Sequence, residues 1–122
     1  KEMEAGRELD ALVAERIMGW KRIPDARQPR GFATAGFHWK LPRGQLILQL
    51  DAFSTDIAAA WQVVEQMNKT QPFFSLYYDD REEIERAYWF CDWSSEYRSG
   101  IGAKANTAPL AICLAALKAV GA

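Results

Sequence analysis

The sequence predicts a single α+β domain with a mostly antiparallel sheet and helices on both faces of that sheet. Its predicted elements follow the order α–β–β–α–β–β–β–α, because three segments show helical apolar spacing and five are typical of strands. The last three strands follow one another through short polar turns, as in hairpins. The length of 122 residues, 49% of them apolar, suits one core, so we expect one domain over residues 1–122.

The first half of the chain predicts one helix and two strands. Residues 3–19 carry an apolar helical stripe, and Gly19 is a suitable helix stop. Residues 21–31 contain two prolines and several basic side chains, which predicts a basic loop. Residues 32–40 and 45–50 are the expected strands, separated by a turn at residues 42–44.

The second half predicts a helix, three strands and a closing helix. Ser54 is the expected N-cap of the helix, Asn68 to Thr70 end it, and Pro72 forbids its continuation. The strands fall at residues 73–78, 84–93 and 97–104, and the first two are apolar on both faces. Such strands require cover on both faces, from helices or from another subunit. The closing helix begins at Thr107. In the helix that begins after Ser54, the side chains expected to be buried are Ile57, Ala60, Trp61, Val64 and Met67.

Composition excludes several classes of protein. The net charge of −1 provides no general attraction to nucleic acid or to anionic lipid. No apolar run approaches the roughly 18 residues that a membrane span needs, and no secretory signal is visible. Cys91 and Cys113 both lie in apolar stretches, which favours buried thiols in a reducing cytosol over a disulfide.

The residues assemble no catalytic or metal-binding set. His38 is the single histidine, and the chain has no Cys-x-x-Cys pair, so we expect no metal and no cofactor. Cys113 lies within a predicted helix and has no motif that pairs it with His38. The acidic residues from Asp79 to Glu83 form a hairpin turn, where we expect solvent rather than the dry environments that acid–base catalysis uses. We therefore expect no enzyme.

Two kinds of feature favour binding of an anionic aromatic ligand. The predicted helix starts at Ser54 and Thr107 offer free backbone N–H groups, which also fits plain capping. Aromatic rings beside cations suit a nucleotide, because rings stack on bases and cations attract phosphate; the same rings also suit a core or a protein interface. The candidate ligand-binding residues are Trp20, Trp39, Lys40, Ser54, Thr55, Arg98, Lys104 and Thr107.

Three stretches resemble a known family. EAGRELDALVAERIMGW at residues 4–20, FSTDIAAAWQVVE at residues 53–65 and TAPLAICLAALKA at residues 107–119 resemble the opening, middle and closing segments of the phage ABA sandwich family. The family usually has Tyr at the position of Phe53. The resemblance implies an α/β/α sandwich of phage or prophage origin in the bacterial cytoplasm, and it implies no activity.

Three functions remain open. The first is a counter-defence protein that sequesters a nucleotide-derived immune signal, of cyclic oligonucleotide or cyclic ADP-ribose type, without cleaving it; phage sponges of similar size are the analogy. Such a protein is expected to be a homo-oligomer with pockets between subunits and no membrane partner. The second is a protein-interaction module or inhibitor of a host protein, which predicts an exposed apolar patch. The third is binding of double-stranded RNA, suggested by the α–β–β–β–α order from Ser54 but disfavoured by Lys104 standing alone and by the net charge.

Overall fold

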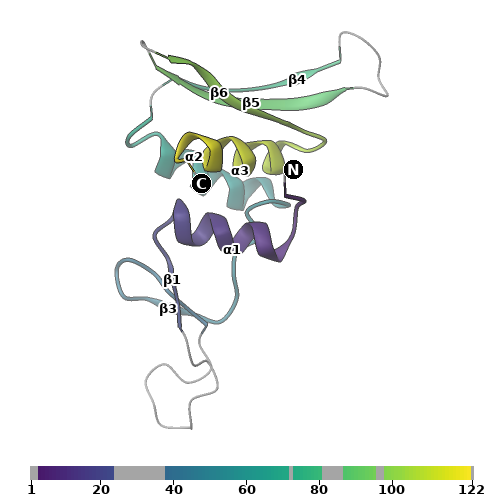
Figure 1. The fold of residues 1–122 in the computed structure, drawn as a ribbon. Helices are drawn as coiled ribbons and strands as arrows, with labels where there is room; N and C mark the ends of the chain where they lie inside the picture. The colour runs from purple at the N-terminus through teal and green to yellow at the C-terminus, as the bar shows by residue number, and fades with distance from the viewer. Residues whose placement is uncertain (1–2, 24–37, 72, 81–86, 96–97, 122) are drawn as a thin grey trace, which may run out of the picture.

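The computed structural model describes residues 3–23, 38–71, 73–80, 87–95 and 98–121, with the side chains of residues 94, 95 and 98–101 left aside. It shows three helices and two three-stranded antiparallel sheets within these ranges (Figure 1). The predicted α+β class is therefore confirmed. The elements are α1 Arg7–Arg16, β1 Lys21–Arg22, β2 Trp39–Lys40, β3 Leu46–Ile47, α2 Ile57–Met67, β4 Phe74–Asp79, β5 Tyr88–Ser95, β6 Arg98–Ala105 and α3 Ala108–Ala119.

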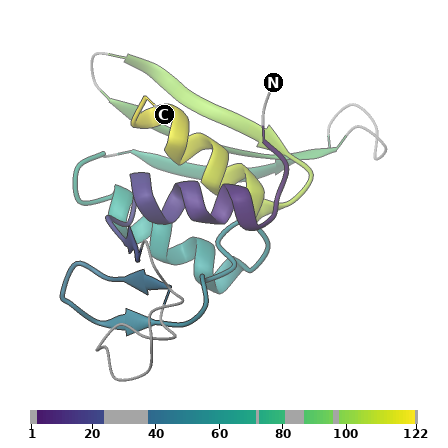
Figure 2. The same ribbon diagram turned by 60° about the horizontal axis from the view of Figure 1, so that its bottom comes forward.

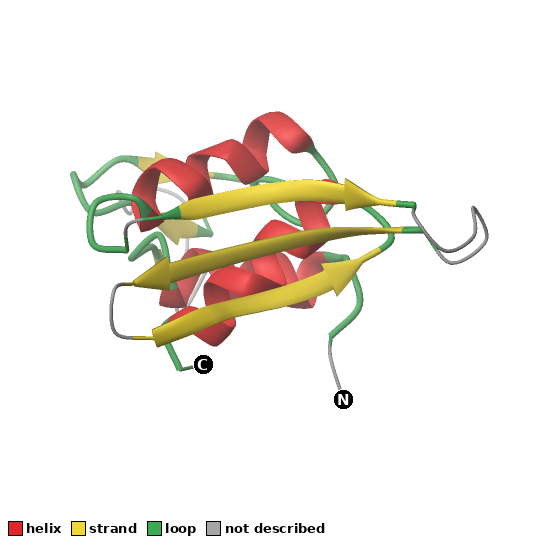
Figure 3. Ribbon diagram, turned by 90° about the horizontal axis from the view of Figure 1, so that it is seen from above, coloured by secondary structure: helices red, strands yellow, loops and turns green. Residues whose placement is uncertain are grey.

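The elements form layers in which the helices lie between the two sheets. The β4–β5–β6 sheet lies against α3 and α2, and α1 lies on the opposite side of these two helices, next to the small β1–β2–β3 sheet (Figures 1 and 2). Seen from above, the outer face of the β4–β6 sheet has no described element over it (Figure 3). The helices expected on both faces are thus found on one face in the described part of the chain.

The central helix α3 is buried on nearly all sides. Pro109 and every residue from Ala111 to Leu117 are buried, and the alanines allow the sheet and α2 to approach closely. Thr107 caps this helix as predicted, because its side chain accepts a hydrogen bond from the backbone N–H of Leu110.

The predicted stripe of α2 is wrong in part. Ala59, Ala60, Val63, Val64 and Met67 are buried, whereas Ile57 is 50% and Trp61 46% exposed. The small alanines bring this helix close to its neighbours, and the two large side chains then lie on its flank.

The β4–β6 sheet places alternate residues on two faces. Leu76, Cys91 and Ala103 are cross-strand partners, and Cys91 and Ala103 are buried toward the helices. Ser75 and Tyr77 therefore point outward. Relative to the predicted strands, β4 extends to Asp79 and β5 extends through Ser94 and Ser95, which were expected in a turn; residues 84–86 lie outside the described ranges.

The first half of the chain needs three corrections. The helix predicted at residues 3–19 is shorter, from Arg7 to Arg16, with Gly6 at a φ of 145° as its N-cap. The expected strand at residues 45–50 is reduced to Leu46–Ile47, and residues 32–37 of the strand before it lie outside the described part of the chain. Lys21–Arg22 begins the region predicted as a loop but pairs with β2 as a strand.

Candidate binding surface

The eight predicted binding residues lie in three separate parts of the fold. Trp20, Trp39 and Lys40 belong to the end of the molecule that holds the small sheet, on the far side of the helices from β6 (Figure 1). Ser54 and Thr55 precede α2. The remaining three lie on β6 and at its connection to α3: Arg98, Lys104 and Thr107. The structure does not bring these positions together in one pocket of the described chain.

The two tryptophans at the small sheet are core residues. Trp20 is 6% and Trp39 is 5% exposed, and their ring centroids lie 6.5 Å apart. Trp20 also packs edge-on against Phe53 at 5.4 Å, and the Arg22 guanidinium carbon lies 4.9 Å from the centre of the Trp39 ring. Their faces are therefore occupied within the fold and do not serve as stacking planes for a ligand. Lys40 remains exposed.

Ser54 is a structural residue and not a helix cap. It is fully buried, and its backbone N–H donates to Oδ1 of the buried Asp10 at 2.7 Å. Its side-chain oxygen accepts from the backbone N–H of Gly6 at 2.9 Å. The N-cap of α2 is Asp56, whose side chain accepts from the backbone N–H of Ala58 at 3.1 Å. Thr55 is exposed beside this cap, where the Asp56 side chain occupies the helix start.

Four side chains on the outer face of the β4–β6 sheet form the most developed binding surface. We name Tyr77, Tyr88, Phe90 and Lys104 the aromatic platform. Tyr77 and Phe90 are cross-strand partners, and their ring centroids lie 5.3 Å apart. Lys104 is the β6 partner of Phe90, and its Nζ lies 4.7 Å from the centre of the Tyr88 ring. Tyr77 is 45% exposed, Lys104 is exposed, and Tyr88 and Phe90 are partly exposed, so rings and a cation meet on one face of the sheet.

A glycine on β6 determines how Phe90 lies on the platform. A Cβ atom at Gly102 would come 2.4 Å from Cζ of Phe90, closer than real side-chain contacts. The tip of the Phe90 ring therefore occupies the space over the β6 backbone that a side chain at position 102 would fill.

Two carboxyl groups border the aromatic platform. Oδ1 of Asp92 accepts from the Ser75 hydroxyl at 2.7 Å, and Oδ2 of Asp79 accepts from the Tyr88 hydroxyl at 3.1 Å. Sequence reasoning identified Lys104 but missed the three rings. The available signal was the apolar pattern on both faces of these strands.

The described residues provide no activated thiol. Burial raises the pKa of Cys91, with a further contribution from the charge of Asp92. Burial, and then the charge of Asp10, raises the pKa of Cys113 to about 12. Both thiols therefore keep their protons at neutral pH, which makes them poor nucleophiles. Within the described ranges, no group of three or more His, Cys, Asp or Glu side chains could hold a metal ion.

Two surface hollows in the described part of the chain are bordered by carboxyl groups. One, of about 430 Å³, is lined by residues 3–8 and includes Glu4 and Glu8. The other, of about 260 Å³, lies before and along α2 and includes Asp51 and Asp56. None of the eight predicted binding residues lines either hollow, and the carboxylates would repel phosphate. Among the described helices, none combines the length and the apolar character needed to cross a membrane.

Within the described ranges, these features define an α+β sandwich of three helices between two antiparallel sheets, with aromatic side chains on the outer face of the larger sheet. The model of the phage ABA sandwich domain matches residues 11–117, and the chain belongs to this family. The family resemblance of the three sequence stretches is thereby confirmed.

A solved structure supports the same fold. The chain is similar to a phage protein from Bacillus cereus ATCC 14579, with a TM-score of 0.63 and 20% sequence identity. The similarity covers 100% of this chain and 94% of the other. No curated protein matches the chain. The family and this neighbour place the chain among phage proteins of one sandwich fold.

Proposed function

We propose that this protein binds a nucleotide-derived immune signal on the aromatic platform and holds it without cleaving it. The signal is of cyclic oligonucleotide or cyclic ADP-ribose type, and the protein acts in the host cytoplasm during phage infection. The observation that carries the proposal is the Tyr77–Phe90 ring pair with Lys104 beside it, on a sheet face over which no described element lies (Figure 3). Rings on adjacent strands of an antiparallel sheet can stack on bases, and a cation next to them attracts phosphate.

Because the aromatic platform is one face of a sheet, it can contact a ligand on one side only. Small-molecule sites bury most of the surface of their ligand, whereas one sheet face contacts only one side of it. Tight retention therefore needs a second surface over the ligand. A further copy of the chain packed face to face on the sheet would supply one, which agrees with the homo-oligomer expected from the sequence.

The absence of cleavage is part of the proposal. The buried cysteines hold their protons, and the carboxyl groups nearest the platform, Asp79 and Asp92, each accept a hydrogen bond from a neighbouring hydroxyl. A protein that only withholds a signal needs tight binding and no chemistry.

The test is a thermal-shift screen of the purified protein against cyclic di- and trinucleotides and cyclic ADP-ribose isomers. We expect one class to raise the melting temperature by several degrees and to be recovered intact, by mass spectrometry, after the protein is heated. A ligand recovered in converted form would show an enzyme, and no shift with any compound would contradict the proposal.

Substitutions of two lysines, one on the aromatic platform and one away from it, test where the ligand binds. Lys104→Ala should weaken binding roughly ten-fold, because loss of about 1.4 kcal/mol corresponds to that factor. Lys69→Ala removes another exposed lysine, whose Nζ donates to the Gln66 side chain on α2, and should leave the affinity unchanged. Equal effects of the two substitutions, measured by isothermal titration, would place the ligand elsewhere.

A protein-interaction role is the second candidate. Five of the seven large apolar side chains exposed in the described ranges lie on α2 or at β4, and this clustering favours a protein contact. They are Ile57, Trp61, Phe73, Tyr77 and Tyr78. Specific capture of a host protein in a pull-down, lost in Trp61→Lys, would support this role over ligand binding.

A further inference from the structure

We propose that β4 pairs with β4 of a second copy of this chain, about a twofold axis perpendicular to the sheet. The pairing would join two three-stranded sheets into one of six strands. This inference goes beyond the proposed function and does not depend on any ligand.

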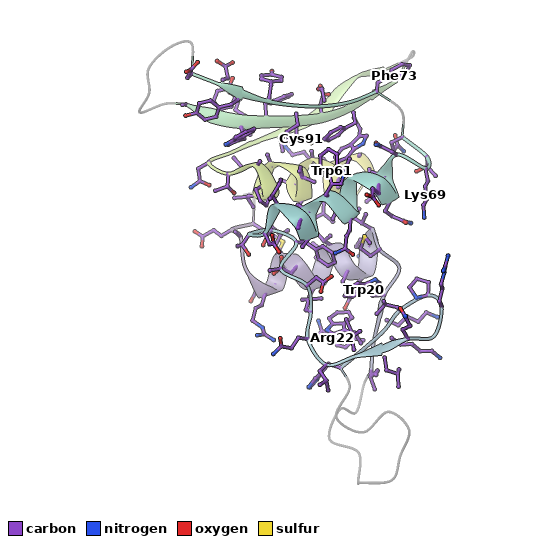
Figure 4. The ribbon with its side chains drawn as sticks, turned by 180° about the vertical axis from the view of Figure 1, so that it is seen from behind. Trp20, Arg22, Trp61, Lys69, Phe73 and Cys91 are labelled. Carbon is purple, nitrogen blue, oxygen red and sulfur yellow. The ribbon has the colours of Figure 1, made fainter. Side chains whose placement is uncertain are left out.

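The first observation is an uncharged apolar surface along β4 and the flank of α2. We name Ile57, Trp61, Phe74, Leu76 and Tyr78 the α2–β4 patch. The Trp61 ring meets the Phe74 ring edge-on at 5.9 Å, and Phe74 packs on the buried Trp93 at 5.1 Å. Figure 4 shows Trp61 pointing from α2 toward the sheet. The exposed rings are therefore held by the core, as the anchoring side chains of protein interfaces are.

The second observation is the open edge of β4. In the described part of the chain β4 pairs only with β5, so no described strand lies along its other edge. Its six residues contain no proline and no lysine, and their single charged residue is Asp79 at the end. Natural proteins usually protect exposed edges with such residues or with a covering element. This edge carries neither protection within the described ranges.

The opposite edge of the sheet is different. The β6 strand includes Arg98 and Lys104. Lys118 of α3 reaches this strand, and its Nζ donates to the backbone oxygen of Gly102 at 3.2 Å. The Lys118 side chain thus covers part of β6, and no such contact protects β4 in the described part of the chain, which leaves β4 as the edge for pairing.

The α2–β4 patch is complementary to the same patch on a second copy of the chain. The α2–β4 patch carries no formal charge, so an identical apolar patch matches it, and a net charge of −1 per chain gives little repulsion between copies. Four roughly half-exposed rings on α2 and at β4 offer about 300–500 Å² per copy, since a buried aromatic side chain covers about 150–250 Å². They are Trp61, Phe73, Tyr77 and Tyr78, two of which belong to the α2–β4 patch. The backbone of a strand about 20 Å long adds to this area. The sum approaches the roughly 800 Å² per partner of a stable interface.

The twofold axis also determines the register. Directly opposed residues of antiparallel strands point to the same face, so the axis must pass through a residue and not between two. An axis at Leu76 places Phe74 opposite Tyr78 of the second copy and keeps apolar side chains together. An axis at Tyr77 would place Phe74 opposite Asp80, and an axis at Ser75 would place Tyr78 opposite position 72, outside β4. Leu76 is therefore the residue on the axis.

Sedimentation equilibrium without ligand tests the interface. We expect the wild-type chain of 13.8 kDa to sediment at twice that mass at micromolar concentration. Ile57→Lys and Trp61→Lys should each raise the dissociation constant at least ten-fold, because a lysine would be buried against an apolar partner. Val120→Lys is the matched control, since Val120 is 45% exposed and lies outside the α2–β4 patch. The proposal would be overturned if the wild-type chain remained a monomer at about 100 micromolar, a concentration typical of such experiments. It would also be overturned if both patch variants dimerised fully.

Cysteine cross-linking tests the register. Leu76→Cys should form a disulfide with its own counterpart under mild oxidation, because opposed Cα atoms lie about 4.5–5.5 Å apart, within disulfide range. Ser75→Cys should not, because Ser75 lies opposite Tyr77 of the second copy and its own counterpart lies two residues further along the strand, about 7–8 Å away and beyond disulfide range. Cross-linking of Ser75→Cys and not of Leu76→Cys would overturn the assigned axis.

Discussion

At the scale of single residues, Asp10 and Ser54 connect two parts of the chain that are 44 residues apart. The bond from the Ser54 N–H to the Asp10 carboxyl oxygen and the bond from the Gly6 N–H to the Ser54 hydroxyl are both part of this connection. They join the start of α1 to the segment before α2. The sequence suggested a cap at Ser54 because Ser favours that role, and nothing in the local pattern revealed the distant Asp10.

The Asp10 contact predicts a specific loss of stability. Asp10→Ala would leave the buried Ser54 N–H without its acceptor, which typically lowers the free energy of unfolding by about 1–3 kcal/mol. Glu8→Ala, at an exposed position of the same helix, should change it by less than about 0.5 kcal/mol. Urea unfolding of both variants measures these free energies. Equal losses in the two variants would argue against the hydrogen bond between Asp10 and Ser54.

The buried thiol of Cys113 predicts a dependence of stability on pH. Between its ordinary pKa of 9.0 and the raised pKa of about 12, the unfolded chain releases a proton that the folded chain keeps. Because the unfolded state binds fewer protons there, the free energy of unfolding should fall as the pH rises through this window. Cys113→Ala should flatten this fall in unfolding curves measured from pH 8 to 10.5. An unchanged slope would mean that the thiol is not buried as described.

At the scale of elements, Phe90 and Gly102 show how β5 and β6 fit together. The Phe90 ring of β5 occupies the space that a side chain at position 102 of β6 would fill, so the effects of substitutions at the two positions depend on each other. Sequence patterning predicted both strands but not this contact, because it depends on the register between them.

A double-mutant cycle tests that coupling. Gly102→Ala should lower the free energy of unfolding by about 1–3 kcal/mol, as overpacking does. In a Phe90→Ala background the loss should be smaller, though not zero, because the new Cβ would still lie 2.9 Å from the Cys91 backbone oxygen. Additive losses in denaturant unfolding would show that the two residues do not interact.

The boundaries of α2 show where sequence reasoning reaches its limit. The helix itself was predictable from its apolar spacing and from the break before Pro72. Its cap and its buried face were not, because the tertiary contacts of Ser54 and the close approach of Ala59 and Ala60 decide them.

At the scale of the whole molecule, burial decides which aromatic residues are free for binding. The sequence shows that rings and cations are abundant, and it identified Lys104 as a binding candidate. It could not show that Trp20 and Trp39 fill the core while Tyr77 remains exposed. That distinction depends on which sheet each strand joins, and here the chain forms two sheets on opposite sides of the helices.

Binding at the aromatic platform can be tested by a heteronuclear NMR titration of the ¹⁵N-labelled protein with the cyclic nucleotides and cyclic ADP-ribose isomers of the screen. We predict chemical-shift changes centred on the amides of the aromatic platform, Tyr77, Tyr88, Phe90 and Lys104, with ligand signals that persist unchanged over hours. Changes centred instead on the small sheet around Arg22 and Lys40, with the platform unaffected, would contradict ligand binding at the platform.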